Sequence, residues 1–88
     1  MFGSKRRQIV RVLNELHSKN ARAWEAIDKG DCAQALDYYI SVIRRYTEAH
    51  LLMDETRPGR DLAASFEHAT RTMNETRDHM QKRLCGRE

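Results

Sequence analysis

Residues that break helices are scarce in this sequence, and this scarcity restricts its fold more than any other feature. The 88 residues include four glycines and a single proline. Between positions 4 and 85, the only such residues are Gly30 and the pair Pro58-Gly59. Glycine suits the left-handed turn after a helix, and proline disfavours helix at the residue before it. We therefore predict three helices, over about residues 5–29, 31–54 and 60–85.

The first predicted helix carries one regular apolar stripe. Its apolar side chains recur in steps of four and three, with Asn20 at one further position of the stripe: Ile9, Leu13, Leu16, Ala23 and Ile27. This spacing is typical of an amphipathic helix with one buried face. Asp31 is expected to cap the next helix, because its carboxylate can accept a hydrogen bond from the backbone near Gln34.

The second predicted helix carries two adjoining apolar rows. One row contains Cys32, Leu36, Tyr39, Ile43, Tyr46, His50 and Met53, and the other contains Ala35, Val42, Ala49 and Leu52. A helix with two apolar rows can contact two neighbours, so we expect this helix to be central. The third helix has one inward row, which consists of Leu62, Phe66, Ala69, Met73, Thr76, Met80 and Leu84.

Short connections make consecutive helices antiparallel, so the predicted fold is an all-α, three-helix, up-down-up bundle in one domain spanning residues 1–88. The alternative is a homodimer in which two chains pool their apolar rows. Asn20 bears on this choice, because a lone asparagine in a helix seam can fix an oligomeric state. In a monomer, Asn20 is expected to bond a polar group on a neighbouring helix, with Thr76 or His50 as candidates.

Composition and charge indicate a soluble, helix-rich protein. Charged residues make up 33% of the chain and apolar residues 40%. No window approaches the length of uncharged apolar sequence that a transmembrane helix needs, and polar residues interrupt the start of the chain where a secretory signal would be apolar. We therefore expect a cytoplasmic protein with no membrane partner. Cys32 and Cys85 fall at the same end of the predicted bundle, without the spacing of a disulfide framework or a zinc site, and are interpreted as ordinary cysteines.

The sequence contains no recognisable catalytic arrangement. It lacks a glycine-rich phosphate loop, a nucleophile with a nearby base, and paired inward carboxylates. Glu75 and His79 are four residues apart, but such pairs are common on solvated helix faces. We therefore predict a protein that is not an enzyme and uses no cofactor, metal or small-molecule substrate.

Two groups of residues are candidates for contact with a partner macromolecule. Trp24, Tyr38 and Ile40 lie off the main stripes or at their edges, and aromatic residues are enriched at protein interfaces. The second group gathers at one end of the predicted bundle and could face an anionic partner: Lys5, Arg6, Arg7, Arg57 and Arg60. The alternative for this basic end is a solvated surface with Asp54, Glu55 and Asp61 as counter-charges.

Residues 23–43, which begin AWEAIDKGDCAQALDYYISV, resemble a tetratricopeptide-repeat hairpin. The small residues at 23, 26 and 35, the turn glycine at 30 and the tyrosine at 39 carry the resemblance. The stretch is even more similar to the first hairpin of microtubule-interacting-and-transport domains, although the third predicted helix departs from their pattern. Both families bind peptides or helices, so the resemblance implies a protein-binding module.

The functional hypothesis from the sequence is therefore a small adaptor, regulator, inhibitor or chaperone-like accessory protein. It would act by binding another protein through a helical surface. The alternative hypothesis is nucleic-acid binding through the basic end of the bundle, although the net charge of +3 is small for a dedicated nucleic-acid-binding protein.

Overall fold

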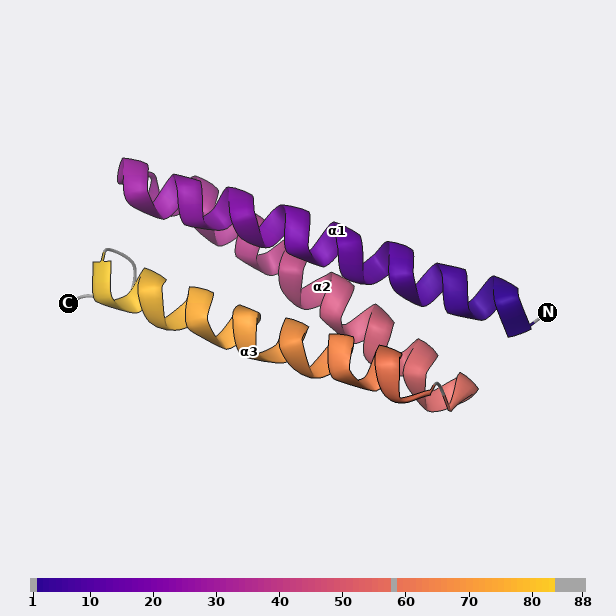
Figure 1. Ribbon diagram of the computed structural model, residues 1–88. Coiled ribbons are helices and arrows are strands. Elements are labelled where there is room, and N and C mark those ends of the chain that lie inside the picture. Colours follow the sequence, from indigo (N-terminus) through magenta and orange to yellow (C-terminus); the bar gives the residue numbers. More distant parts are fainter. Residues whose placement is uncertain (1, 58, 84–88) are drawn as a thin grey trace.

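The computed structural model describes residues 2–57 and 59–83, with side chains from residue 5 onward. The chain folds into three helices: α1 Phe2–Lys29, α2 Cys32–Thr56 and α3 Arg60–Arg83. Consecutive helices run in opposite directions and lie alongside one another (Figure 1). This confirms the predicted three-helix, up-down-up bundle. The last two residues of the predicted third helix, Leu84 and Cys85, lie outside the described residues.

The turn between α1 and α2 follows the predicted capping chemistry. Gly30 has a φ of +83°, a left-handed conformation that glycine adopts without steric cost. Its backbone N–H donates to the carbonyl of Ile27 at 3.0 Å. The backbone N–H of Gln34 donates to Oδ1 of Asp31 at 3.0 Å, so the Asp31 carboxylate caps α2 as expected.

The end of α2 agrees with the predicted end near residue 54 to within two residues. The helix continues to Thr56, and Arg57 then adopts the left-handed conformation with a φ of 48° and a ψ of 64°. The backbone N–H of Arg57 donates to the carbonyl of Met53 at 3.2 Å, which closes the last turn. Cβ crowds the backbone in this conformation, so an arginine here is strained where a glycine would not be.

The predicted stripe of α1 forms the largest part of the core. All five of its apolar residues are buried, together with Val12 and Ala26. The core divides into two clusters along the bundle. One contains the first half of α1 with Val42, Ala49, Leu52, Leu62 and Ala69. The other lies near the Gly30 turn and contains Ala26, Ile27, Ala35, Tyr39 and Met80.

The second helix buries only part of its predicted apolar surface. The row of Ala35, Val42, Ala49 and Leu52 is buried as expected, but Leu36, Ile43 and His50 are exposed. Their predicted inward position was therefore wrong. The reason is the packing order: α1 makes the most extensive contacts with both other helices, whereas the contact between α2 and α3 is the smallest. The central helix is α1, not α2, and one side of α2 stays uncovered.

Asn20 is buried within a single chain, and its amide oxygen accepts a hydrogen bond there. Asn20 is 3% exposed and Thr76 is fully buried. The Thr76 hydroxyl lies 2.6 Å from Oδ1 of Asn20, to which it donates, and accepts a hydrogen bond from Nε1 of Trp24, also at 2.6 Å. Thr76 was one of the two partners expected for Asn20 in a monomer. These three side chains join α1 to α3 through a buried polar contact.

Candidate partner-binding surface

Four apolar side chains form an exposed ridge on α2. They are Leu36, Ile40, Ile43 and Leu51, which we call the α2 ridge, and each is between 41% and 57% exposed. The first three follow steps of four and three, so they share one side of the helix, and Leu51 lies two turns further along. A row of half-exposed large aliphatic side chains is a feature that soluble proteins usually bury or use for binding.

The ridge is exposed because the neighbouring helices contact other sides of α2. On the α3 side, Tyr46 stacks on Phe66 with ring centroids 4.9 Å apart. On the α1 side, Arg45 forms an ion pair with Glu15 at 3.3 Å. The ridge residues lie on the arc of α2 beyond the α3 contact, where no other described element covers them.

The three partner-binding candidates from the sequence do not lie together. Ile40 belongs to the α2 ridge and is 41% exposed. Trp24 is half-buried between α1 and α3, where its indole stacks on the ring of His79 with centroids 3.8 Å apart. Tyr38 is half-buried against α1, with Nζ of Lys19 5.8 Å from its ring centroid. Only Ile40 therefore faces solvent in an apolar group. Leu36 and Ile43 were predicted to lie in the core. Leu51 was not a candidate because it belongs to neither of the two apolar rows predicted for the second helix.

The basic end is partly neutralised. Nζ of Lys5 lies 3.1 Å from Oε1 of Glu55, and Arg6 is paired with Asp61. The hydrogen bond from Arg6 lowers the pKa of the Asp61 carboxyl below its usual value, and the same bond raises the pKa of Arg6. These contacts match the counter-charges considered for a solvated surface.

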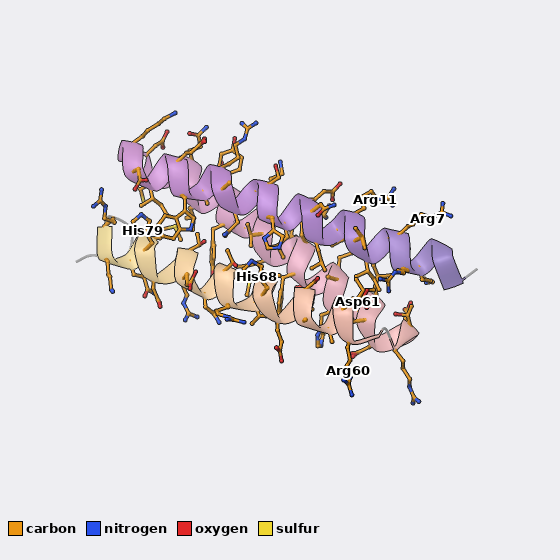
Figure 2. All side chains as sticks on the ribbon, viewed as in Figure 1. Arg7, Arg11, Arg60, Asp61, His68 and His79 are labelled. Carbon is orange, nitrogen blue, oxygen red and sulfur yellow. The ribbon has the colours of Figure 1, made fainter. Side chains whose placement is uncertain are left out.

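The other cations of this end do not converge. In Figure 2, Arg7 and Arg60 point away from opposite edges of the bundle. Arg57, Arg7 and Arg60 are exposed, and within the described part of the chain none of them forms an ion pair. Lys5 and Arg6 are thus paired with Glu55 and Asp61. The other three cations of the basic end form no common cluster.

The four histidines all lie at contacts with neighbouring rings or carboxylates. His17 of α1 faces His68 of α3 with ring centroids 5.4 Å apart. Burial, and then the nearby His68, lower the pKa of His17. Nε2 of His79 lies 3.1 Å from Oδ1 of Asp28 rather than near Glu75. Among the described residues, no group of three or more histidine, cysteine or acidic side chains is placed to hold a metal ion.

Cys32 is disulfide-bonded in the structure and is exposed at the start of α2. Its interpretation as an ordinary cysteine was therefore wrong. The error came from taking the absence of a characteristic cysteine spacing as evidence against a disulfide. The beginning of α2 and the end of α3 do lie at the same end of the bundle, as predicted (Figure 1). The other cysteine of the chain, Cys85, lies outside the described residues.

Comparisons with known proteins add no relative from which function could be inferred. No protein-family model, curated protein or solved structure matches the chain. The resemblance of residues 23–43 to tetratricopeptide-repeat and microtubule-interacting-and-transport hairpins thus stays a prediction. Within the described residues, no helix is both long enough and apolar enough to cross a membrane.

Proposed function

We propose that this protein is a non-enzymatic protein-binding module whose α2 ridge docks on an amphipathic helix of a partner protein. The observation that carries the proposal is the exposure of Leu36, Ile40, Ile43 and Leu51 on one side of α2. Their spacing is the spacing with which one helix presents apolar anchors to another. The roles of small adaptor, regulator, inhibitor or chaperone-like accessory protein are all compatible with such a surface.

The size of the ridge fits a short helix. Leu36 and Leu51 are fifteen positions apart, which corresponds to about 22 Å of helix, or roughly four turns. Covering four half-exposed aliphatic side chains contributes roughly 4 kcal/mol, taking about half of the value for complete burial of each. Association also costs several kcal/mol of lost rigid-body freedom. The ridge therefore supports a transient interaction of modest affinity, unless polar contacts at its rim add to it.

A capture experiment with matched variants tests this proposal. Wild-type protein, the double variant Ile40→Asp/Ile43→Asp and the control Val10→Asp are each used as bait in an extract of the native host, and captured proteins are identified by mass spectrometry. Val10 is 40% exposed on α1, so it controls for adding charge to an exposed apolar position. We expect a protein that the wild type and the Val10 variant capture and the double variant does not. Capture that is equal for all three folded baits would contradict binding through the ridge.

Nucleic-acid binding through the basic end is the alternative function and is less favoured. Two of its five cations, Lys5 and Arg6, are paired with carboxylates, and Arg7 and Arg60 point in different directions. Phosphate contacts are strongest at low salt. Gel-shift titrations at a low and a physiological salt concentration test this alternative, and absence of binding at low salt would eliminate it.

The homodimer and the cytoplasmic location stay predictions. The sequence argument for a dimer used Asn20, whose amide oxygen accepts a hydrogen bond from Thr76 of the same chain. Sedimentation equilibrium at high protein concentration decides the oligomeric state directly. A monomer at hundreds of micromolar would remove the dimer from consideration without affecting the proposed binding of a helix.

A further inference from the structure

A polar cleft lies between α1 and α2, beside the α2 ridge but separate from it. Its volume is about 320 Å³. Each helix contributes three residues at positions i, i+3 and i+4, a spacing that places them on one side of that helix. The lining residues are Glu15, Ser18 and Lys19 of α1 and Ser41, Arg44 and Arg45 of α2.

The cleft has an excess of positive charge and of hydrogen-bond donors. Lys19, Arg44 and Arg45 contribute three positive charges and Glu15 one negative charge, which gives the lining a net charge of +2, or +1 when Glu48, the second partner of Arg45, is counted. Ser18 and Ser41 add two hydroxyl groups to the lining. Within the described part of the chain, neither hydroxyl forms a hydrogen bond and Arg44 forms no ion pair. The donors of the cleft are thus largely uncommitted.

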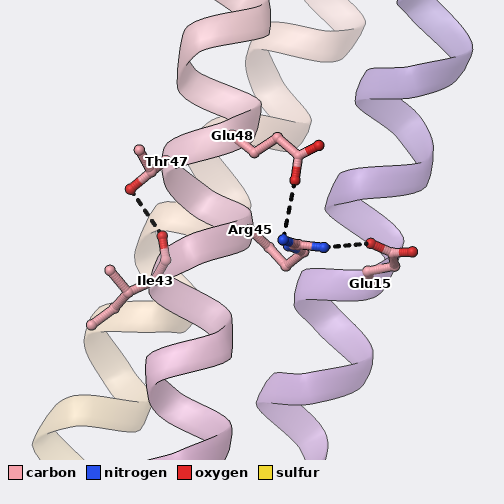
Figure 3. A network of polar contacts seen from close by, with 5 residues as sticks. All are labelled: Glu15, Ile43, Arg45, Thr47 and Glu48. Atoms are coloured by element: carbon pink, nitrogen blue, oxygen red, sulfur yellow. Dashed lines mark hydrogen bonds and ion pairs between the residues drawn. The ribbon is translucent and has the colours of Figure 1, made fainter.

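Arg45 is held in place and still has one donor unused. Its two terminal nitrogens each lie 3.3 Å from a carboxylate, of Glu15 on α1 and Glu48 on α2 (Figure 3). The third nitrogen, Nε, is buried and has no hydrogen-bond partner among the described residues. Buried polar atoms are nearly always satisfied by protein, water or a ligand. Arg45 is therefore anchored at the contact between α1 and α2 by its two carboxylate partners.

We propose that this cleft binds a phosphate group, either as the free anion or as the phosphomonoester of a phosphorylated molecule. A phosphate group is attracted by the net positive charge of the cleft. Its oxygens are strong acceptors for guanidinium, ammonium and hydroxyl groups. Arg44 and Lys19 supply cations that form no ion pair among the described residues, and the two serines supply hydroxyl donors. Arg45 adds a guanidinium held between Glu15 and Glu48. A cationic ligand would be repelled by this charge.

A titration followed by NMR tests the proposal without any knowledge of the protein partner. The labelled 88-residue protein is titrated at low, constant ionic strength with inorganic phosphate, with sulfate, and with N-acetyl-O-phosphoserine amide. The backbone amide signals of Ser18 and Ser41 are followed. We expect saturable shifts at these two residues. We also expect phosphate binding to weaken at acidic pH, where phosphate gains a proton, while sulfate binding changes little.

Variants of exposed arginines separate a specific site from general charge attraction. Arg44→Gln is expected to weaken phosphate binding about tenfold, because a hydrogen bond to a charged group is among the stronger ones. Arg44→Lys should retain part of the affinity. Arg71→Gln removes the same charge from α3, outside the cleft, and should leave affinity unchanged. Because Arg44 is exposed and forms no ion pair among the described residues, its variants should fold normally.

The outcomes decide both the site and the source of the phosphate. Shifts that never saturate, or equal weakening by Arg44→Gln and Arg71→Gln, would overturn the proposal. Tighter binding of the phosphoserine compound than of inorganic phosphate supports the site and assigns it to phosphorylated side chains. The reverse order supports the site and assigns it to the free anion.

Discussion

The buried hydroxyl of Thr76 provides the most direct test of how this bundle is held together. It joins Asn20 and Trp24 of α1 to α3, and each hydrogen bond is 2.6 Å long. Thr76→Val keeps the shape and the β-branching of the side chain but removes the hydroxyl. Oδ1 of Asn20 then lacks a partner in a site that is 3% exposed. The indole N–H of Trp24 also loses its acceptor, although this half-buried group can partly turn to water.

The expected cost follows from these two unsatisfied groups. A buried donor or acceptor without a partner costs about 1–3 kcal/mol, so the two together cost roughly 3 kcal/mol, with Trp24 counted in part. The additional methyl group of valine offsets up to about 1 kcal/mol. We therefore expect Thr76→Val to lower the free energy of unfolding by about 2 kcal/mol. For a domain of this size, that is a fall in Tm of roughly 10 °C.

Two companion variants make the test selective. Thr47→Val removes a hydroxyl that donates to the carbonyl of Ile43 at 3.0 Å on the exposed side of α2 (Figure 3), and should change stability by less than about 0.5 kcal/mol. Asn20→Leu should cost less than Thr76→Val, because the Thr76 hydroxyl can still donate to the carbonyl of Thr72 at 3.0 Å. Urea denaturation followed by circular dichroism measures all three. The reasoning is refuted if Thr76→Val costs no more than Thr47→Val, or if Asn20→Leu is the more destabilising change.

Three further predictions concern other parts of the chain. Arg57→Gly should raise the free energy of unfolding by about 0.5–1 kcal/mol, because it relieves the left-handed strain at the end of α2, and unchanged denaturation midpoints would contradict this. The pKa of His17 is lowered on folding by burial and by His68, so folding disfavours its protonation. The associated stability is present above the unfolded-state pKa and is lost as pH falls through that value toward the lower folded-state pKa. The loss of stability between neutral and mildly acidic pH should then be smaller in His17→Gln, as measured by urea denaturation at several pH values. Finally, protein purified without reductant should show no titratable Cys32 thiol after denaturation, whereas reaction of Cys32 with a thiol reagent before reduction would contradict the disulfide.

The sequence predicted local features well because each depends on neighbouring residues. Gly30 and Asp31 form the turn that their chemistry favours, and the single stripe of α1 could be buried in only one way. The two rows of α2 were different. Both are apolar, and which of them is buried depends on where α3 packs, which is a property of the whole bundle. Leu36 and Ile43 were assigned to the core for this reason, although they form half of the α2 ridge.

Three other features of the structure could not be predicted because no pattern in the sequence indicates them. Arg57 ends α2 in the left-handed conformation, which can be predicted from a sequence only where a glycine or an asparagine stands at that position. The contact of Trp24 with Thr76 joins residues of α1 and α3 whose relative register follows from tertiary packing. The polar cleft has the same origin: the spacing of Ser18 and Lys19, or of Ser41 and Arg44, becomes meaningful only when α1 and α2 are placed side by side.

The position of Trp24 also gives the molecule a built-in optical reporter. It is the only tryptophan of the chain, and its indole lies between α1 and α3, stacked on the imidazole of His79. Its fluorescence therefore responds to the attachment of α3, whereas circular dichroism responds to all three helices together. If the two signals change at the same denaturant concentration, the bundle unfolds as one cooperative unit. If the fluorescence changes first, α3 separates from a hairpin of α1 and α2 that is still folded.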